Sequence, residues 1–205
     1  MGRRRIEPGK GQESVWDYPR PPRLEDVDKK VKVVFGGVTL AYTMRAKRVL
    51  ETSHPPVYYI PQQDIRMEHL EPSDGSSHCE WKGRASYYNA ATEERTEMRA
   101  AWFYPDPTPR FAGLEDYVAF YPSRMDGCWV GGEKVEAQEG DFYGGWITPD
   151  IVGPFKGAPG TWGWQIHRER LESSQRIHPR WPGQRRRRPR PYSPVSRVVR
   201  ENHRR

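Results

Sequence analysis

Apolar and polar residues alternate with a period of two along segment 31–42. The apolar positions of this alternation are Val31, Val33, Phe35, Val38, Leu40 and Tyr42. The glycine pair Gly36-Gly37 divides the segment, and a glycine pair between two alternating stretches is typical of a tight β-hairpin. Gly131-Gly132 divides residues 128–135 in the same way. The pattern therefore predicts two hairpins, each with its turn at a glycine pair.

Apolar runs predict further strands at 57–60, 81–89, 97–104 and 117–121. The second and third of these are expected to pair across the polar turn 91–96. One face of strand 97–104 is expected to carry Met98, Ala100, Trp102 and Tyr104. Pro56 and Pro61 flank strand 57–60, and proline cannot donate a hydrogen bond to a sheet. We therefore expect that strand to be short or to lie at an edge.

The remaining segments predict loops and short helical turns. The polar composition of 71–77 is typical of a loop. Thr108 can cap, and Pro109 can open, a short helix that runs to about Asp116. No periodic segment supports a helix longer than about three turns, so the sequence predicts a mainly β domain.

Composition divides the chain into three parts. Residues 1–13 are polar and basic and are interpreted as a disordered lead, and residues 14–164 as the folded domain. Residues 165–205 hold 13 Arg, no Lys and 3 Glu, a formal charge of +10. Since the whole chain carries +7, residues 1–164 sum to −3. The basic character thus belongs to an Arg/Pro-rich tail that we expect to be largely disordered.

Two interpretations of this tail stay open. Its arginine run, within residues 185–190, would release counterions on meeting phosphate and so bind nucleic acid without sequence specificity. The alternative is a dispensable disordered segment. The sequence shows neither a signal-peptide pattern nor an apolar stretch of about 18 residues, so we expect a cytoplasmic protein without a membrane partner. Cys79 and Cys128 are then expected to be reduced thiols.

Residues 51–83 concentrate the candidate chemistry. His54 precedes Pro55-Pro56, which favours an extended backbone and a ring presented on a loop. With Glu51 and Ser53 nearby, the imidazole would be suited to acid–base work. The alternative is a turn histidine whose ring bonds to the backbone.

Cys79 is the second candidate. A nucleophilic cysteine needs a cation or an imidazole beside it, and His78, Lys82 and His54 are the available groups. If residues 79–83 form a strand, however, Lys82 points away from the thiol. A buried thiol packed beside Trp81 is the simpler interpretation. Two distant cysteines give no set of zinc ligands, so we expect no metal and no cofactor.

Aromatic residues on these segments predict a ligand pocket between 51–61, 79–83 and the 102–104 strand. The expected ligand-binding residues are His54, Tyr59, Trp81, Lys82, Trp102 and Tyr104. Catalysis, if present, would rest on Cys79, His54 or Glu51. The alternative is that the aromatic side chains simply form the core.

Eight sequence blocks, in order, resemble a known family. They read ESVWDYPRPPRLE, VVFGG, VLETSHPPVYYIP, CEWKGRASYY, AAWFYPDP, VAFYP, FYGGWIT and IVGPFKG followed by PGTWGW. Together they span about Glu13 to Trp164 and are similar to the domain-of-unknown-function 427 family. The resemblance implies a small β-tent-like domain of two antiparallel sheets with short helical turns. This architecture is shared with zinc-knuckle modules and methionine sulfoxide reductase-like domains, although the chain lacks their Cys-x-x-Cys pairs.

The same family is sometimes described as nucleotidyltransferase-like. The chain contains no Gly-Ser followed by an Asp-x-Asp pair, which phosphoryl transfer with Mg²⁺ would use. The resemblance brings no catalytic residues with it. Three functions therefore follow from the sequence: a small-molecule or polar-ligand binding module, an enzyme based on Cys and His or resembling a nucleotidyltransferase, and an interaction protein that acts through its tail.

Overall fold

The computed structural model describes residues 5–140 and 143–157. Their largest element is a seven-stranded antiparallel sheet. Its strand order is β2 (Arg23–Asp26), β5 (Lys47–Leu50), β6 (Val57–Pro61), β10 (Tyr117–Phe120), β9 (Thr96–Phe103), β8 (Gly83–Ala91) and β7 (Leu70–Cys79). A four-stranded antiparallel sheet has the order β12 (Glu133–Lys134), β11 (Gly127–Val130), β3 (Val31–Phe35) and β4 (Val38–Thr43).

Two short strand pairs and five 3₁₀ helices complete the described part. The strand pairs are β1 (Glu13–Ser14) with β15 (Ile151–Val152), which is parallel, and β13 (Glu136–Ala137) with β14 (Trp146–Ile147). The 3₁₀ helices are η1 (Val15–Asp17), η2 (Gln62–Asp64), η3 (Met67–His69), η4 (Pro109–Leu114) and η5 (Pro122–Arg124). The predicted mainly β domain with antiparallel sheets and short helical turns is confirmed. None of the helices in the described ranges is long and apolar enough to cross a membrane.

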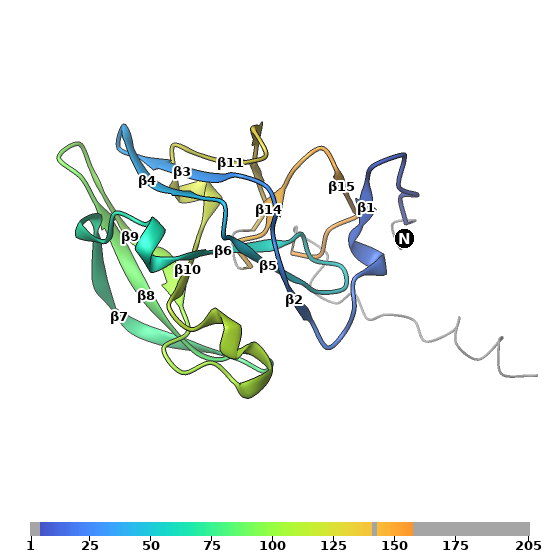
Figure 1. Ribbon diagram of the computed structural model, residues 1–205, viewed down its shortest axis with the longest axis horizontal. Helices are drawn as coiled ribbons and strands as arrows, with labels where there is room; N and C mark the ends of the chain where they lie inside the picture. The colour runs from blue at the N-terminus through green and yellow to red at the C-terminus, as the bar shows by residue number, and fades with distance from the viewer. Residues whose placement is uncertain (1–4, 141–142, 158–205) are drawn as a thin grey trace, which may run out of the picture. The chain divides into compact units, whose positions relative to one another are not determined.

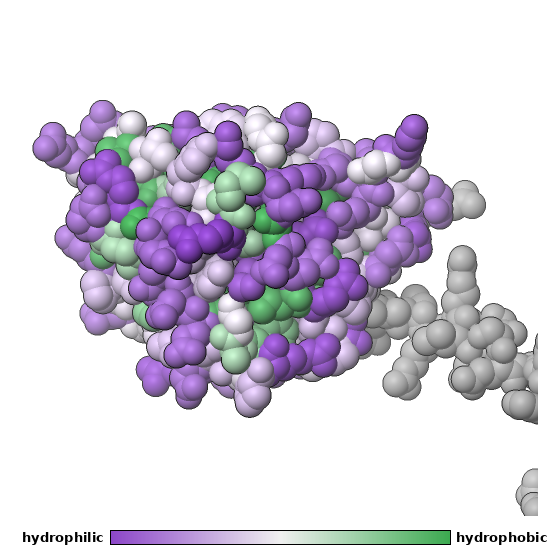
Figure 2. Space-filling view, viewed as in Figure 1, coloured by the Kyte–Doolittle hydropathy of each residue, from purple (hydrophilic) through white to green (hydrophobic). Residues whose placement is uncertain are grey.

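The main hydrophobic core lies between the two larger sheets. It contains Val33 and Phe35 of β3 together with Ile60 of β6 and Phe120 of β10, all fully buried. Figure 1 shows β3, β4 and β11 on one side of β6, β9 and β10. On the face seen in Figure 2, hydrophilic residues cover most of the surface, and apolar residues appear as smaller patches between them. The core therefore holds the two sheets together.

A second core cluster covers the opposite face of the large sheet. Tyr59 and Trp102 belong to it, together with Phe111 and Leu114 of η4. Tyr58, the neighbour of Tyr59, belongs instead to the main core. Since successive side chains of a strand point to opposite faces, β6 is buried on both sides. The second face is the one that carries the candidate site.

Both predicted glycine-pair hairpins are confirmed. β3 and β4 join through Gly36-Gly37, whose φ angles of 50° and 70° suit a tight hairpin turn. β11 and β12 join through Gly131-Gly132. The pairing of β8 with β9 is confirmed as well.

Two of the predictions for individual segments are wrong. The first concerns residues 71–77, which form part of β7, an edge strand whose side chains are mostly exposed, so its polar composition reflects solvation and not a loop. The prediction for β6, a strand that is short or lies at an edge, is confirmed because the strand is short, although it lies inside the sheet between β5 and β10. Its prolines leave the ladder intact because Pro56 precedes the strand and Pro61 ends it.

The second wrong prediction concerns the single face of β9. Arg99 has a φ of 51°, and the register with β8 shifts between Tyr88 and Ala90. This bulge breaks the alternation, so Met98 is 60% exposed, whereas Trp102 and Tyr104 are buried.

The two ends of the chain are described only in part. Residues 5–13 of the predicted lead contact the domain through Ile6 N, which donates to Gly153 O at 3.3 Å, and Gln12 Nε2, which donates to Pro149 O at 2.9 Å. Residues 1–4 and the predicted tail 165–205, with its arginine run, lie outside the described residues. The disorder and nucleic-acid binding expected of them stay predictions.

Candidate functional site

A cavity of about 750 Å³ opens on the second face of the large sheet. Its walls come from the segment before β6, the β7–β8 hairpin, β9 and the residues that precede β14. All eight predicted site residues line it: Glu51, His54, Tyr59, Cys79, Trp81, Lys82, Trp102 and Tyr104. The fold therefore brings together the three segments that the sequence proposed as pocket walls. The roles of these residues stay predictions.

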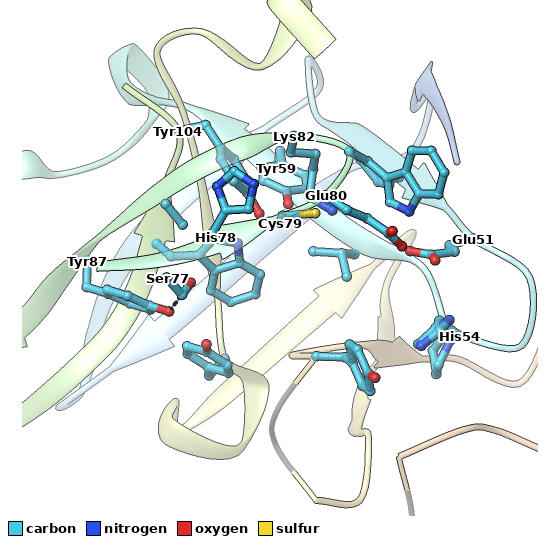
Figure 3. A pocket seen from close by; sticks show the side chains of 18 of the residues that line it. Glu51, His54, Tyr59, Ser77, His78, Cys79, Glu80, Lys82, Tyr87 and Tyr104 are labelled. Carbon is cyan, nitrogen blue, oxygen red and sulfur yellow. Dashed lines mark hydrogen bonds between the residues drawn. The ribbon is translucent and has the colours of Figure 1, made fainter. Parts of the chain in front are cut away.

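The hairpin between β7 and β8 places Lys82. Cys79 pairs with Gly83 at the end of the ladder, so residues 80–82 form a turn. Gly83 has a φ of 97°, which favours glycine at this reversal. The prediction that 79–83 form a strand is wrong, and so is its consequence that Lys82 points away from the thiol. In Figure 3 the Lys82 side chain lies beside Cys79 and Tyr59.

Two hydrogen bonds hold this turn against the segment that precedes η4. Thr108 Oγ1 donates to Trp81 O at 2.6 Å, and Thr108 N donates to Lys82 O at 3.1 Å. Thr108 precedes η4 as predicted, but its hydroxyl makes no cap. It anchors the turn of the cavity wall instead.

Lys82 is a buried cation. It is 9% exposed, and its ammonium lies 5.8 Å from the ring centre of Tyr104 and 6.0 Å from that of Phe111. Burial acts to lower the pKa of Lys82, but interactions with Tyr59, Cys79 and Glu51 outweigh it, so that the pKa is raised. Lys82 is therefore charged at neutral pH.

Two buried tyrosines surround Lys82 and Cys79. Tyr59 is 1% and Tyr104 5% exposed, and their ring centres lie 6.5 Å apart. Burial raises the pKa of both hydroxyls. At neutral pH both are uncharged groups that can donate or accept a hydrogen bond.

His54 lies at another part of the wall. Its Nδ1 is 2.9 Å from Thr52 O, and because a carbonyl only accepts, Nδ1 carries the proton. Nε2 is then an acceptor, and it is buried without a hydrogen-bond partner. The ring packs edge-on against Tyr143, with 4.4 Å between ring centres. Burial lowers the pKa of His54, although Glu51 opposes this, so the ring is neutral at pH 7.

Arg20 links two carboxylates at the cavity. It pairs with Glu51 at 3.4 Å and with Glu80 at 2.8 Å, and its guanidinium lies 5.7 Å from the centre of the Trp81 ring. The Trp81 Nε1 donor is buried without a partner. Arg20 comes from the proline-rich N-terminal arm, and no local pattern marks it as a site residue.

Other wall residues were also missed by the sequence interpretation. Arg99 lies over the Tyr87 ring at 3.9 Å, and the Tyr87 hydroxyl donates to Ser77 Oγ at 2.7 Å (Figure 3). The remaining ones include Arg124 and Tyr143. The bulge at Arg99 places its side chain at the cavity, and this bulge has no sequence signature of its own.

The structure does not join the predicted Cys–His pair. Figure 3 shows the sulfur of Cys79 near Tyr59 and Lys82, with His54 at the far side of the labelled group, beyond Glu51. Cys79 and Cys128 are both free thiols. Within residues 5–140 and 143–157, no three His, Cys, Asp or Glu side chains are placed to hold a metal ion. The site as described is therefore an aromatic and basic cavity.

The lowered pKa of His54 has a consequence for stability. The unfolded chain binds a proton at His54 near the ordinary pKa of 6.5, whereas the folded chain binds it only at lower pH. The contribution of His54 to stability therefore falls as pH decreases below 6.5, by up to about 1.4 kcal/mol per pH unit. We expect His54→Gln to reduce this slope between pH 6.5 and about 5 in urea unfolding. His78→Gln, which replaces an exposed histidine, is the variant for comparison. An unchanged slope in His54→Gln would contradict the argument.

Comparison with known proteins gives one family. The chain has no match among curated proteins. Residues 23–131, more than half of the chain, match the family described as a domain of unknown function, DUF427, whose short name agrees with the nucleotidyltransferase-like label. The match covers the strands from β2 to β11 and thus most of the cavity wall. The chain therefore belongs to the DUF427 family of domains of unknown function.

Proposed function

We propose that the chain is a binding module for a small, planar, polar molecule held in this cavity. The observation that carries the proposal is a pair of buried polar atoms without hydrogen-bond partners on the cavity-lining residues His54 and Trp81. Buried polar groups are nearly always hydrogen-bonded, and leaving one unsatisfied costs about 1–3 kcal/mol. A ligand that bonds to both atoms would remove that cost.

The two atoms require opposite hydrogen-bonding groups on the ligand. His54 Nε2 accepts and so requires a ligand N–H or O–H, whereas Trp81 Nε1–H requires a ligand acceptor. Heterocycles and aromatic amides carry a donor and an acceptor on a flat frame. The tyrosine and tryptophan rings of the wall offer faces and edges against which such a frame can stack. The cavity volume lies in the range of small-molecule sites, about 300–1,000 Å³.

Thermal shift and calorimetry with planar probes test the proposal. Nicotinamide, adenosine and riboflavin should raise the melting temperature, while the saturated analogue piperidine-3-carboxamide should not. Trp81→Phe keeps the ring and removes the donor, and we expect it to weaken binding about 5- to 30-fold. His54→Phe should have a similar effect. Trp129→Phe, on β11 away from the cavity, is the matched control. The proposal fails if no planar probe binds, or if Trp81→Phe binds as tightly as the unsubstituted chain.

A further inference from the structure

The charge that lines the cavity is opposite in sign to that of the domain. Residues 1–164 carry a formal charge of −3, yet the cavity is lined by five basic side chains and two carboxylates. The basic residues are Arg20, Lys82, Arg99, Arg124 and Lys156. Both carboxylates, Glu51 and Glu80, are paired with Arg20. A cleft lined by one sign of charge raises the local concentration of the opposite ion. The cavity is therefore biased toward anions by the basic side chains that the fold brings to it, and not by the net charge of its domain.

Lys82 is the buried one of these five basic side chains. It is 9% exposed, and none of the ion pairs formed by the described residues includes it. The rings of Tyr104 and Phe111 stabilise the ammonium by only about 0.5–2 kcal/mol. Lys82 is therefore held charged in the cavity without a carboxylate that neutralises it.

The groups around the ammonium suit an oxyanion. The hydroxyls of Tyr59 and Tyr104 are uncharged, lie next to Lys82 and hydrogen-bond to each other. A ligand oxyanion could replace a hydroxyl as the acceptor in this network, to which the Cys79 thiol also belongs. Hydrogen bonds from neutral donors together with one ammonium are the usual way of holding a carboxylate or a phosphate. The carboxylate that acts on Lys82 is that of Glu51, which is bound to Arg20.

We propose that the planar ligand carries an oxyanion, a carboxylate or a phosphate, that binds to the ammonium of Lys82. This inference rests on the proposed function, because it specifies the charge of the molecule held in the same cavity. Lys82 is thus a binding residue kept charged for its ligand. Its removal should weaken binding of the anion without weakening the fold.

Matched pairs of probes separate charge from shape. Nicotinate and nicotinamide differ in a carboxylate, and adenosine 5′-monophosphate and adenosine differ in a phosphate. In at least one pair we expect the anion to bind about tenfold or more tightly than its neutral partner in calorimetry at low salt. The pair that shows this preference identifies the oxyanion as carboxylate or phosphate. Equal affinities in both pairs would overturn the inference and leave the proposed function standing. No binding by any of the four probes would also overturn the inference, and the proposed function falls with it if riboflavin does not bind either.

The Lys82→Met variant tests the assignment to this residue. The preference for the anion should disappear, while the affinity for the neutral probe should change by less than about threefold. The melting temperature of the variant without ligand should be equal to that of the unsubstituted chain or higher. A preference that survives, or a melting temperature lower by about 5 °C or more, would contradict the inference. Lys134→Met, at an exposed lysine of β12, is the control.

Amide chemical shifts in the unsubstituted chain give a measurement that does not depend on the folding of a variant. Titration with the preferred anion should move the resonances of residues 79–83 by clearly more than titration with its neutral partner. Equal movements would contradict an oxyanion at Lys82.

Discussion

Replacing Trp146 with alanine is expected to lower the free energy of unfolding by about 3–5 kcal/mol. Trp146 is fully buried in the main core, where its ring centre lies 5.1 Å from that of Tyr58. Its Nε1 donates to Phe120 O at 3.1 Å, so the substitution leaves a buried carbonyl without its partner as well as a cavity. Urea unfolding followed by circular dichroism measures the change.

The same variant should also weaken ligand binding. The backbone N of Trp146 donates to Pro56 O at 2.9 Å and thus ties the segment before β14 to the one that carries His54. Loosening this connection makes the wall of the cavity less ordered. Trp129→Ala is the control, because Trp129 is half-buried and lies on the four-stranded sheet. We expect it to cost about 1 kcal/mol or less. Equal losses from the two variants would contradict the place given to Trp146 in the core.

The importance of Trp146 could not be predicted from its own segment. Residues 140–164 are rich in Gly, Pro and Trp, a composition that indicates irregular chain covering a sheet. The partners of Trp146, Phe120 and Tyr58, are distant in sequence, and no local pattern pairs them. By contrast, the hairpin at Gly36-Gly37 could be predicted because its strands are adjacent and its turn needs glycine.

The candidate site shows the same division between local and distant information. The residue types in the segments around His54 and Cys79 predicted a site there, and the fold brings both segments to one cavity. The predicted direction of the Lys82 side chain was wrong. The prediction applied the alternation of a β-strand to residues 80–82, which form a turn. Arg20 and Tyr143 were missed because they reach the cavity from chain segments about 30 residues or more from His54, and tertiary structure alone places them.

Replacing Arg48 with methionine is expected to lower the free energy of unfolding by about 2–3 kcal/mol, between the values for exposed and for buried ion pairs. Arg48 on β5 is 19% exposed in its side chain and pairs with Glu13 at 3.1 Å and Glu25 at 2.6 Å. Burial acts to lower the pKa of Arg48, but its hydrogen bonds to Glu13 and Glu25 raise it overall. Without the guanidinium, Glu13 would lose its cationic partner and Glu25 would keep only the exposed Arg23.

The expected loss from Arg48→Met comes from these carboxylates and not from the methylene groups, which methionine largely retains. The combined variant Arg48→Met, Glu13→Gln, Glu25→Gln should therefore recover most of the stability in urea unfolding. Arg23→Met is the control, since Arg23 also pairs with Glu25, at 3.1 Å, but is 58% exposed. We expect it to cost about 0.5 kcal/mol or less. If the combined variant is no more stable than Arg48→Met alone, charge pairing is not what Arg48 contributes. Packing of its side chain between β1, β2 and β5 would then account for the effect.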